Sequence, residues 1–160
     1  MAPEQDLANR DDVSRLVTDF YRRAFADPLI GPVFTDIARM DLAAHLPVMC
    51  DFWETVLFRA GRYRRNALRV HVRLHRLAPL EAAHFARWLA LWTDTVDELF
   101  SGPKAELAKV QAERIGGSLL RRVQGGEAGE VVSFHRTRPA ADGAPPSVTG
   151  RSAPHPEWRT

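Results

Sequence analysis

Residues 45–71 read HLPVMCDFWETVLFRAGRYRRNALRVH, and we take them as the centre of the fold. An apolar helix with His45 at its start is followed by a Gly-Arg-Tyr turn and a short basic segment that delivers His71. Two histidines on separate segments, facing each other across apolar surface, suit a flat apolar cofactor with a metal at its centre. The stretch therefore predicts a cofactor pocket between the two histidines, with the rest of the chain as its walls.

The composition is that of an ordinary globular protein. A length of 160 residues predicts one domain, and the net charge of +2 together with the absence of a long basic block argues against a nucleic-acid partner. The single cysteine, Cys50, excludes an intramolecular disulfide and fits a reducing compartment. We find no signal-peptide pattern and no run near the roughly 20 apolar residues that span a bilayer. We therefore expect a cytoplasmic protein.

Helical periodicity dominates the chain from residue 11 to residue 124, which we predict to be the folded domain. Apolar residues recur at three- and four-residue steps after Asp11, and Asp11 or Asp12 is positioned to cap that helix. Further helices are predicted from a cap at Asp41 to Gly61, within 66–76, with Pro79 in the first turn of the next one, and after Pro103. This pattern predicts an all-α fold of about six helices with no strand of consequence.

The helix after Pro103 is predicted to bury Leu107, Val110, Ile115, Leu119 and Val123. Two glycines inside it, at 116 and 117, each cost roughly 1 kcal/mol relative to alanine, so we expect a close helix contact or a kink there.

Both ends of the chain lie outside the predicted domain. Residues 1–10 are expected to be a loose leader or a short first helix. Residues 125–160 are rich in Pro, Gly, Ala and Ser and are expected to be disordered, although 131–135 could pair as a strand.

Several polar residues on these apolar faces have both a structural and a functional interpretation. Tyr21 is either a tyrosine at the core edge with its hydroxyl in water or a donor aimed into a pocket. Trp88 belongs to an aromatic stripe that is normally core, yet its N–H needs an acceptor when buried. His71 and His75 have the four-residue spacing of some zinc sites, but the further ligands of such a site are missing.

Five motifs, in this order and spacing, resemble the group III truncated haemoglobins, and they cover residues 13–123. The motifs are FYRRAF at 20–25, PLIGPVF at 28–34, HLPVMCDFW at 45–53, GRYRRNALRVH at 61–71 and HFARWLALW at 84–92. The resemblance implies a two-over-two helical sandwich that binds haem b, iron protoporphyrin IX.

The resemblance also implies a role for each matching residue. His71 corresponds to the proximal haem iron ligand, whose other ring nitrogen needs a hydrogen-bond acceptor. Tyr21, His45 and Trp88 correspond to the distal residues that face a bound ligand. The implied pocket is completed by Phe34, Met49, Phe52, Trp53, Tyr63 and Leu68. The arginines near Tyr63, with Arg73 or His75, are candidates for the haem propionates.

Oxygen bound to ferrous haem carries partial negative charge. Each hydrogen-bond donor in a dry pocket therefore stabilises the bound state by about 1.5–3 kcal/mol. Strong retention is unsuited to bulk oxygen transport and favours chemistry on O2, NO or peroxide, such as NO dioxygenation or a peroxidase-like reaction, with CO as another ligand.

Such a protein needs a reductase, and we expect a monomer or a weak homodimer. His45 is left with two roles, as a gate or as a sixth iron ligand. The alternative function is a cofactor-free helical interaction domain.

Overall fold

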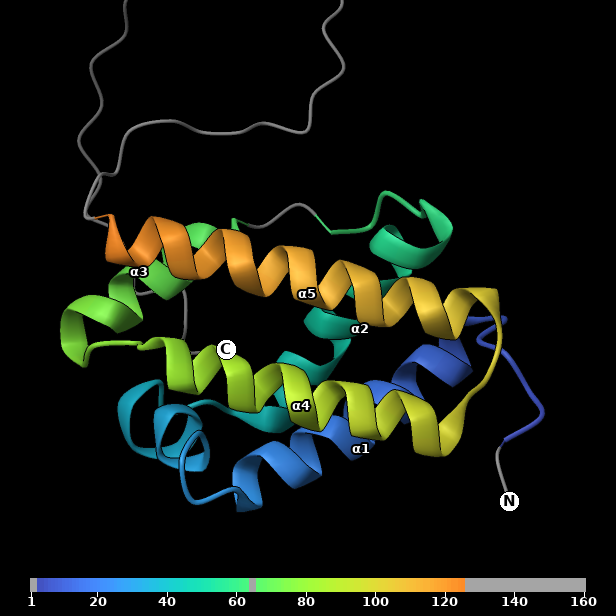
Figure 1. The fold of residues 1–160 in the computed structure, drawn as a ribbon, viewed down its shortest axis with the longest axis horizontal. Coiled ribbons are helices and arrows are strands. Elements are labelled where there is room, and N and C mark those ends of the chain that lie inside the picture. The colour runs from blue at the N-terminus through green and yellow to red at the C-terminus, as the bar shows by residue number, and fades with distance from the viewer. Residues whose placement is uncertain (1–2, 64–65, 126–160) are drawn as a thin grey trace, which may run out of the picture.

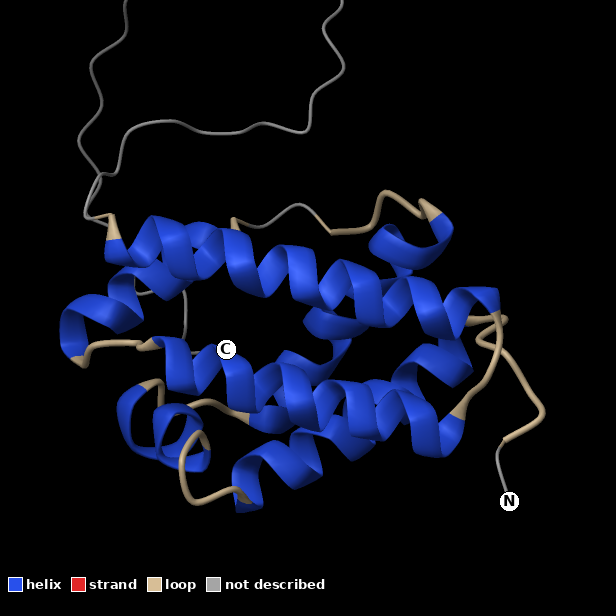
Figure 2. Ribbon diagram, viewed as in Figure 1, coloured by secondary structure: helices blue, strands red, loops and turns tan. Residues whose placement is uncertain are grey.

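The computed structural model describes residues 3–63 and 66–125, and every regular element within them is helical (Figure 2). The all-α prediction is therefore confirmed for this part of the chain. The predicted disordered tail lies outside the described residues except for Gly125. The elements are α1 (Arg10–Ala26), the π-helix η1 (Val33–Ile37), α2 (Leu42–Phe58), α3 (Ala67–Leu77), α4 (Ala82–Leu99) and α5 (Pro103–Gln124).

The long helices form two layers. Helices α4 and α5 lie side by side in front in Figure 1, with α1 and α2 behind them, and short α3 lies against α5 at one end of the molecule. This arrangement is the two-over-two sandwich that the sequence predicts. Within the described residues, no helix is both long enough and apolar enough to cross a membrane.

The centre of the core is Trp92 of α4. Its ring stacks on Trp53 of α2 at 4.2 Å and meets Phe20 of α1 edge-on at 5.2 Å. Its indole N–H donates to the carbonyl of Ala108 in α5 at 3.2 Å. One side chain thus joins all four long helices, and the aromatic stripe predicted for α4 is confirmed as core.

Helix α5 packs mainly through small residues, and of the residues predicted to be buried only Val123 is fully so. Its buried positions are Ala105, Ala108, Ala112, Gly116 and Val123. Val110, predicted to be buried, is 43% exposed, and Leu107, Ile115 and Leu119 are half-buried. The short side chains allow the α5 backbone to approach Trp92 closely, which periodicity alone does not reveal.

At the glycine pair, Gly116 is buried and faces the ring of Trp88, with room for a Cβ at an ordinary contact distance. A methyl group on this residue would lie 3.5 Å from the ring of Trp88. The helix continues through both glycines without interruption.

The helix ends differ from the prediction in three places. Helix α1 is capped by Asn9, whose side chain accepts from the N–H of Asp12, rather than by Asp11 or Asp12. Helix α2 is capped by Asp41 as predicted, but it ends at Phe58 with left-handed Arg59 instead of reaching Gly61. Pro79 lies before the first turn of α4, which is capped by Glu81.

The leader is attached to the domain and is not loose. Leu7 is only 2% exposed, and the Asp6 carboxylate accepts from the backbone N–H groups of Lys104 and Ala105 at 2.9 and 2.8 Å. Gly102 has φ 144°, and a Cβ there would overlap Asp6. Asp6, almost 100 positions away in the sequence, thus caps α5 by accepting from N–H groups that the helix itself leaves unpaired.

We predict that Asp6→Ala lowers the free energy of unfolding by about 1 kcal/mol, because two N–H groups of α5 lose their acceptor. Urea denaturation followed by circular dichroism measures the change. Glu4→Ala removes the same charge from an exposed leader position and serves as the control. Equal midpoints for the two variants would contradict the capping role.

Candidate functional site

A cavity of about 720 Å³ opens between the two layers at the α3 end of the molecule. The four residues with predicted ligand roles, Tyr21, His45, His71 and Trp88, all line it. The predicted wall residues that also line it are Phe34, Met49, Phe52, Trp53 and Tyr63. The structure therefore brings together side chains from α1, η1, α2, α4 and the segment around α3 into one space.

Leu68 is the predicted wall residue that does not line this cavity. Val70 lines it instead. Two positions along an α-helix place side chains on nearly opposite sides, so the face that carries Val70 cannot also carry Leu68.

The distal side of the cavity is built by contacts between aromatic rings. Tyr21 meets Phe34 edge-on at 5.7 Å and His45 edge-on at 5.9 Å. Phe34 is in turn stacked on Phe25 at 5.4 Å. The π-helix, which the sequence did not predict, therefore brings an aromatic residue against α1 and helps to fix the Tyr21 ring.

The Tyr21 hydroxyl is a neutral donor at the cavity wall. Tyr21 is 6% exposed, and burial raises the pKa of its hydroxyl well above the ordinary value, with smaller contributions from Cys50 and Tyr63. Within the described residues its hydroxyl makes no hydrogen bond, and no fully buried polar side-chain atom there lacks a partner. The hydroxyl must therefore reach accessible space, and Tyr21 lines the cavity.

The Trp88 ring is held on two sides. It lies parallel to Trp92 at 6.2 Å and meets Phe20 edge-on at 6.0 Å, and its six-membered ring faces Gly116. The indole nitrogen belongs to the opposite end of the ring from the atoms near Gly116. Like the Tyr21 hydroxyl, it donates to no other described residue, so both groups remain available to a ligand.

The imidazole of His71 is oriented by its own helix. Its Nδ1 lies 2.7 Å from the carbonyl oxygen of Ala67, which can only accept, so Nδ1 carries the proton. Partial removal of this half-buried ring from water lowers the pKa of His71, opposed in part by the hydrogen bond, and favours the neutral ring. The lone pair is therefore on Nε2, which is the form of histidine that binds a metal.

Helix α3 is amphipathic, yet none of its residues is buried. Its apolar residues Val70, Leu74 and Leu77 line the cavity, and Val70 and Leu77 are 49% and 63% exposed. An apolar helix face normally packs against another element. Here the face borders the cavity instead.

Only some of the candidates for propionate binding line the cavity. Arg73 lines the cavity, and so does Arg69, which the sequence analysis missed although it lies one helical turn before Arg73. His75 does not line it, and its Nδ1 accepts from the N–H of Leu80 at 2.9 Å. Arg62 lies 3.7 Å from Glu54, and residues 64 and 65 lie outside the described residues.

A second residue that the sequence analysis missed is His84. It lines the cavity one turn before Trp88, and its Nδ1 accepts from the N–H of Glu81 at 2.9 Å. Its four-residue spacing from Trp88 places both residues on one face of α4, and this spacing could have indicated His84 from the sequence.

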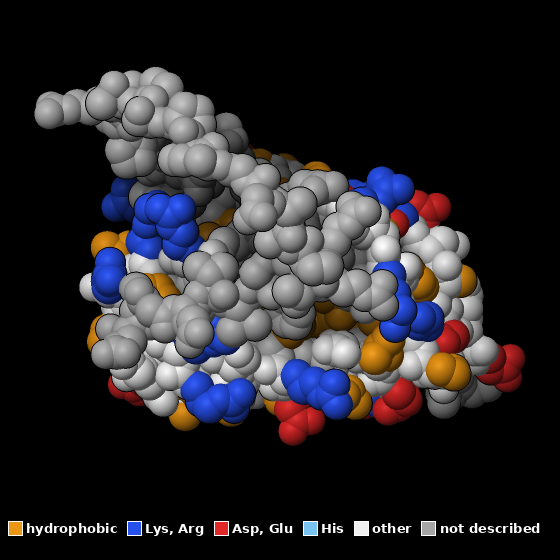
Figure 3. All heavy atoms as spheres, turned by 90° about the horizontal axis from the view of Figure 1, so that it is seen from above, with side chains coloured by type: hydrophobic (Ala, Val, Ile, Leu, Met, Phe, Trp, Pro, Cys, Tyr) orange, Lys and Arg blue, Asp and Glu red, His pale blue; other side chains and the backbone are white. Residues whose placement is uncertain are grey.

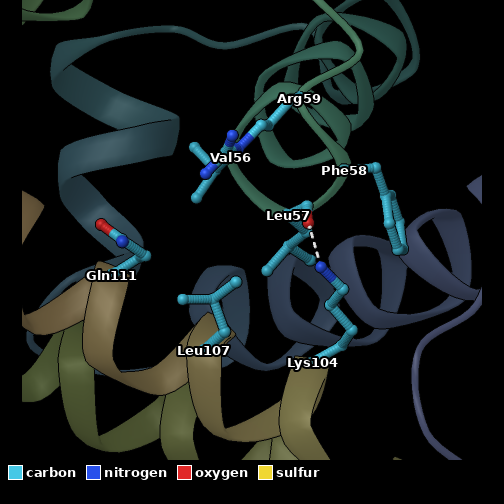
Figure 4. A pocket seen from close by; sticks show the side chains of 7 residues that line it. All are labelled: Val56, Leu57, Phe58, Arg59, Lys104, Leu107 and Gln111. Atoms are coloured by element: carbon cyan, nitrogen blue, oxygen red, sulfur yellow. Dashed lines mark hydrogen bonds between the residues drawn. The ribbon is translucent and has the colours of Figure 1, made fainter.

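A smaller cavity of about 330 Å³ lies between the end of α2 and α5 (Figure 4). Lys104 Nζ donates to the Leu57 carbonyl at 2.7 Å, and its ammonium lies 5.5 Å from the centre of the Phe58 ring. This lysine satisfies a carbonyl at the helix end, so its position there has a structural explanation.

Comparisons with known proteins agree with the architecture. No family model matches the sequence, and no curated protein matches it either. Among solved structures, the group III truncated haemoglobin from Campylobacter jejuni matches with a TM-score of 0.66 and 22% identity, covering 77% of this chain and 95% of that one. The chain has a truncated-globin fold. Sequence identity at this level establishes the arrangement of the helices, and the roles of the site residues are argued below.

Asp27 stabilises the turn at the end of α1. This buried carboxylate accepts from the N–H groups of Leu29 and Ile30 at 2.9 and 3.0 Å and from Arg87 at 2.6 Å. Burial alone would raise the pKa of Asp27, but the hydrogen bonds from Ile30, Arg87 and Leu29 outweigh it, and the pKa is lowered. The turn that leads to η1 and Phe34 is thereby fixed.

We predict that Asp27 stabilises the fold in a pH-dependent manner. Because its folded pKa is depressed, the stabilisation is present above the unfolded value of about 3.9 and is lost as the pH falls through the folded pKa. Asp27→Asn should lower the free energy of unfolding by about 1 kcal/mol at pH 7, since Arg87 is partly exposed. Thermal unfolding at a series of pH values should show this difference shrinking below about pH 4. A difference independent of pH would contradict the ionic role.

Proposed function

We propose that this protein binds haem b in the large cavity and uses it to bind O2, NO and related small ligands. The observation that carries the proposal is the apolar face of α3, whose residues Val70, Leu74 and Leu77 line the cavity and are not buried by the described part of the chain. Burying such a face stabilises a helix by roughly 25 cal/mol for each Å² removed from water. A flat apolar cofactor placed there would supply the missing packing.

The residues present fit this cofactor. The cavity volume of about 720 Å³ falls in the range of small-molecule and cofactor sites, and the lining is mainly aromatic and aliphatic. His71 presents a neutral imidazole with its Nδ1 proton held by Ala67, which leaves Nε2 as the ligand. Haem would supply an iron atom that binds diatomic molecules, and His71 would be its proximal ligand.

The other side of the cavity offers the donors that a polar diatomic ligand requires. Tyr21 on α1 and Trp88 on α4 approach from different helices, and each has a hydrogen atom to donate. His45 lies beside Tyr21, where it can gate entry or bind iron as a sixth ligand. Donors in an apolar environment hold a ligand for a long time, which suits reactions of NO or reactive oxygen species better than oxygen transport.

The cellular setting follows from this chemistry. With haem bound, oxidation of NO would leave the iron oxidised, so we propose a reductase as partner, and we place the protein in the cytoplasm. CO and peroxide are further ligands for the same pocket. We propose a monomer or weak homodimer.

We predict that His71→Ala abolishes stable haem retention while leaving the helical content nearly unchanged, because the residue supplies a bond to the cofactor and little packing. The measurement is the Soret band, and its shift under CO, after purification with added haem. His75→Asn, on the same helix but outside the cavity, should retain haem.

Normal haem content in His71→Ala would refute the proximal assignment. A colourless wild-type protein after haem supplementation would instead support the cofactor-free interaction domain.

Trp88→Phe is expected to speed O2 dissociation by roughly tenfold, the equivalent of one lost hydrogen bond to a partly charged ligand. Stopped-flow mixing of the oxygenated protein with CO measures this rate. Tyr21→Phe keeps the ring contacts with Phe34 and His45 and tests the second donor in the same way. Unchanged dissociation rates in both variants would exclude these residues from the ligand site.

A further inference from the structure

Positive charge is concentrated around α3. Residues 55–80 contain seven arginines and no Asp or Glu, although the whole chain has a net charge of only +2, so the rest of the chain is net acidic. In Figure 3 the end of the molecule that holds α3 shows mainly Lys and Arg, whereas most Asp and Glu lie toward the other end and the lower edge. The protein therefore has a charge asymmetry that can orient an approaching partner.

The described arginines of α3 lie on one side of that helix. Arg69, Arg73 and Arg76 follow at steps of four and three residues and are all exposed. Val70 and Leu77 lie beside this row and are the two exposed large apolar residues of α3. We call these five residues the α3 face.

The three arginines of the α3 face have no carboxylate partner among the described residues. Within the described part of the chain none of the three forms an ion pair, whereas Arg10, Arg23 and Arg87 all bind carboxylates. Like charges three or four residues apart destabilise a helix, and Arg69 in the first turn of α3 also opposes the helix dipole. The fold thus carries a row of unpaired cations that weakens the helix, which calls for an anionic partner outside the fold.

The composition of the α3 face is that of a protein-binding surface. Arginine and exposed aliphatic residues are combined, and lysine is absent from it, a pattern enriched at interfaces. The face also borders the cavity mouth, because Arg69, Val70, Arg73 and Leu77 are exposed and line the cavity at the same time. A protein that docks there would approach the edge of a cofactor held by His71.

We propose that the α3 face is the docking surface for an acidic electron-donor protein that carries a reduced flavin or an iron–sulfur cluster. This inference rests on the proposed function. The donor gives up one electron, and the same electron reduces ferric iron in the pocket to ferrous iron, so no further reactant is needed. Arg69 and Arg73 can also neutralise carboxylates of the cofactor, but Arg76 does not line the cavity, so it distinguishes docking of a partner from binding of the cofactor.

The test uses Arg76→Glu and the matched control Arg114→Glu. Arg114 is exposed on α5, is unpaired among the described residues and gives the same change in net charge. A photoreduced acidic flavodoxin serves as the donor, and reduction of the ferric full-length protein is followed in stopped flow under CO. The rate with wild-type protein should fall about tenfold between low and high salt.

Arg76→Glu is expected to lower the low-salt rate about fivefold and to flatten the salt dependence, while Arg114→Glu stays within about twofold of the wild type. Reduction by dithionite, which needs no docking, should be the same for all three proteins. Equal rates for wild type and Arg76→Glu would overturn the proposal. An equal loss in Arg114→Glu would also overturn it, because net charge rather than the α3 face would then be responsible.

A binding measurement separates this inference from the haem proposal. Oxidised flavodoxin is titrated onto the full-length protein as purified, and Arg76→Glu should weaken binding about fivefold while Arg114→Glu does not. If the wild-type protein took up no haem, the proposed function would fail while this titration still reported on the α3 face. Binding to a heparin column through Arg76 with no binding of flavodoxin would assign the face to a polyanion and overturn the proposal.

Discussion

The stacking of Trp92 on Trp53 is the contact on which the rest of the molecule depends. It joins the two layers, and the indole N–H of Trp92 fixes the distance to α5 through the carbonyl of Ala108. The core fills the space on one side of Trp92, and the large cavity lies on the other side, since Trp53 and Trp92 also line it. The same two rings therefore close the core and form the inner wall of the site.

The polar groups of the site are positioned by short-range interactions. The imidazole of His71 is turned by a carbonyl of its own helix, and Tyr21 is held by rings from η1 and α2. Removal from water opposes charge on both side chains, raising the pKa of Tyr21 and lowering that of His71. A pocket of neutral donors and one neutral metal ligand needs no rearrangement of charge when an apolar cofactor enters.

The sequence predicts this site well where helical periodicity and motif spacing act together. Tyr21, His45, His71 and Trp88 belong to helices whose apolar faces are clear, and the cavity brings them together. Leu68 does not line the cavity. Helix α3 is too short for its apolar periodicity to show which of its sides faces the cavity. The buried alanines of α5 and the capping of that helix by Asp6 depend on tertiary approach, and the π-helix at Phe34 depends on the turn held by Asp27. Local patterns do not contain that information.

The row of small buried residues on α5 also determines how wide the site is. Ala108 and Ala112 allow the helix backbone to lie against α4, and Gly116 continues the row as far as the cavity wall. The separation of α4 and α5 is thus set by main chain rather than by deformable side chains. A larger side chain at Ala108 or Ala112 would act as a spacer between the two helices, so the size of the molecules that the cavity admits can be tuned from α5 without touching any polar residue.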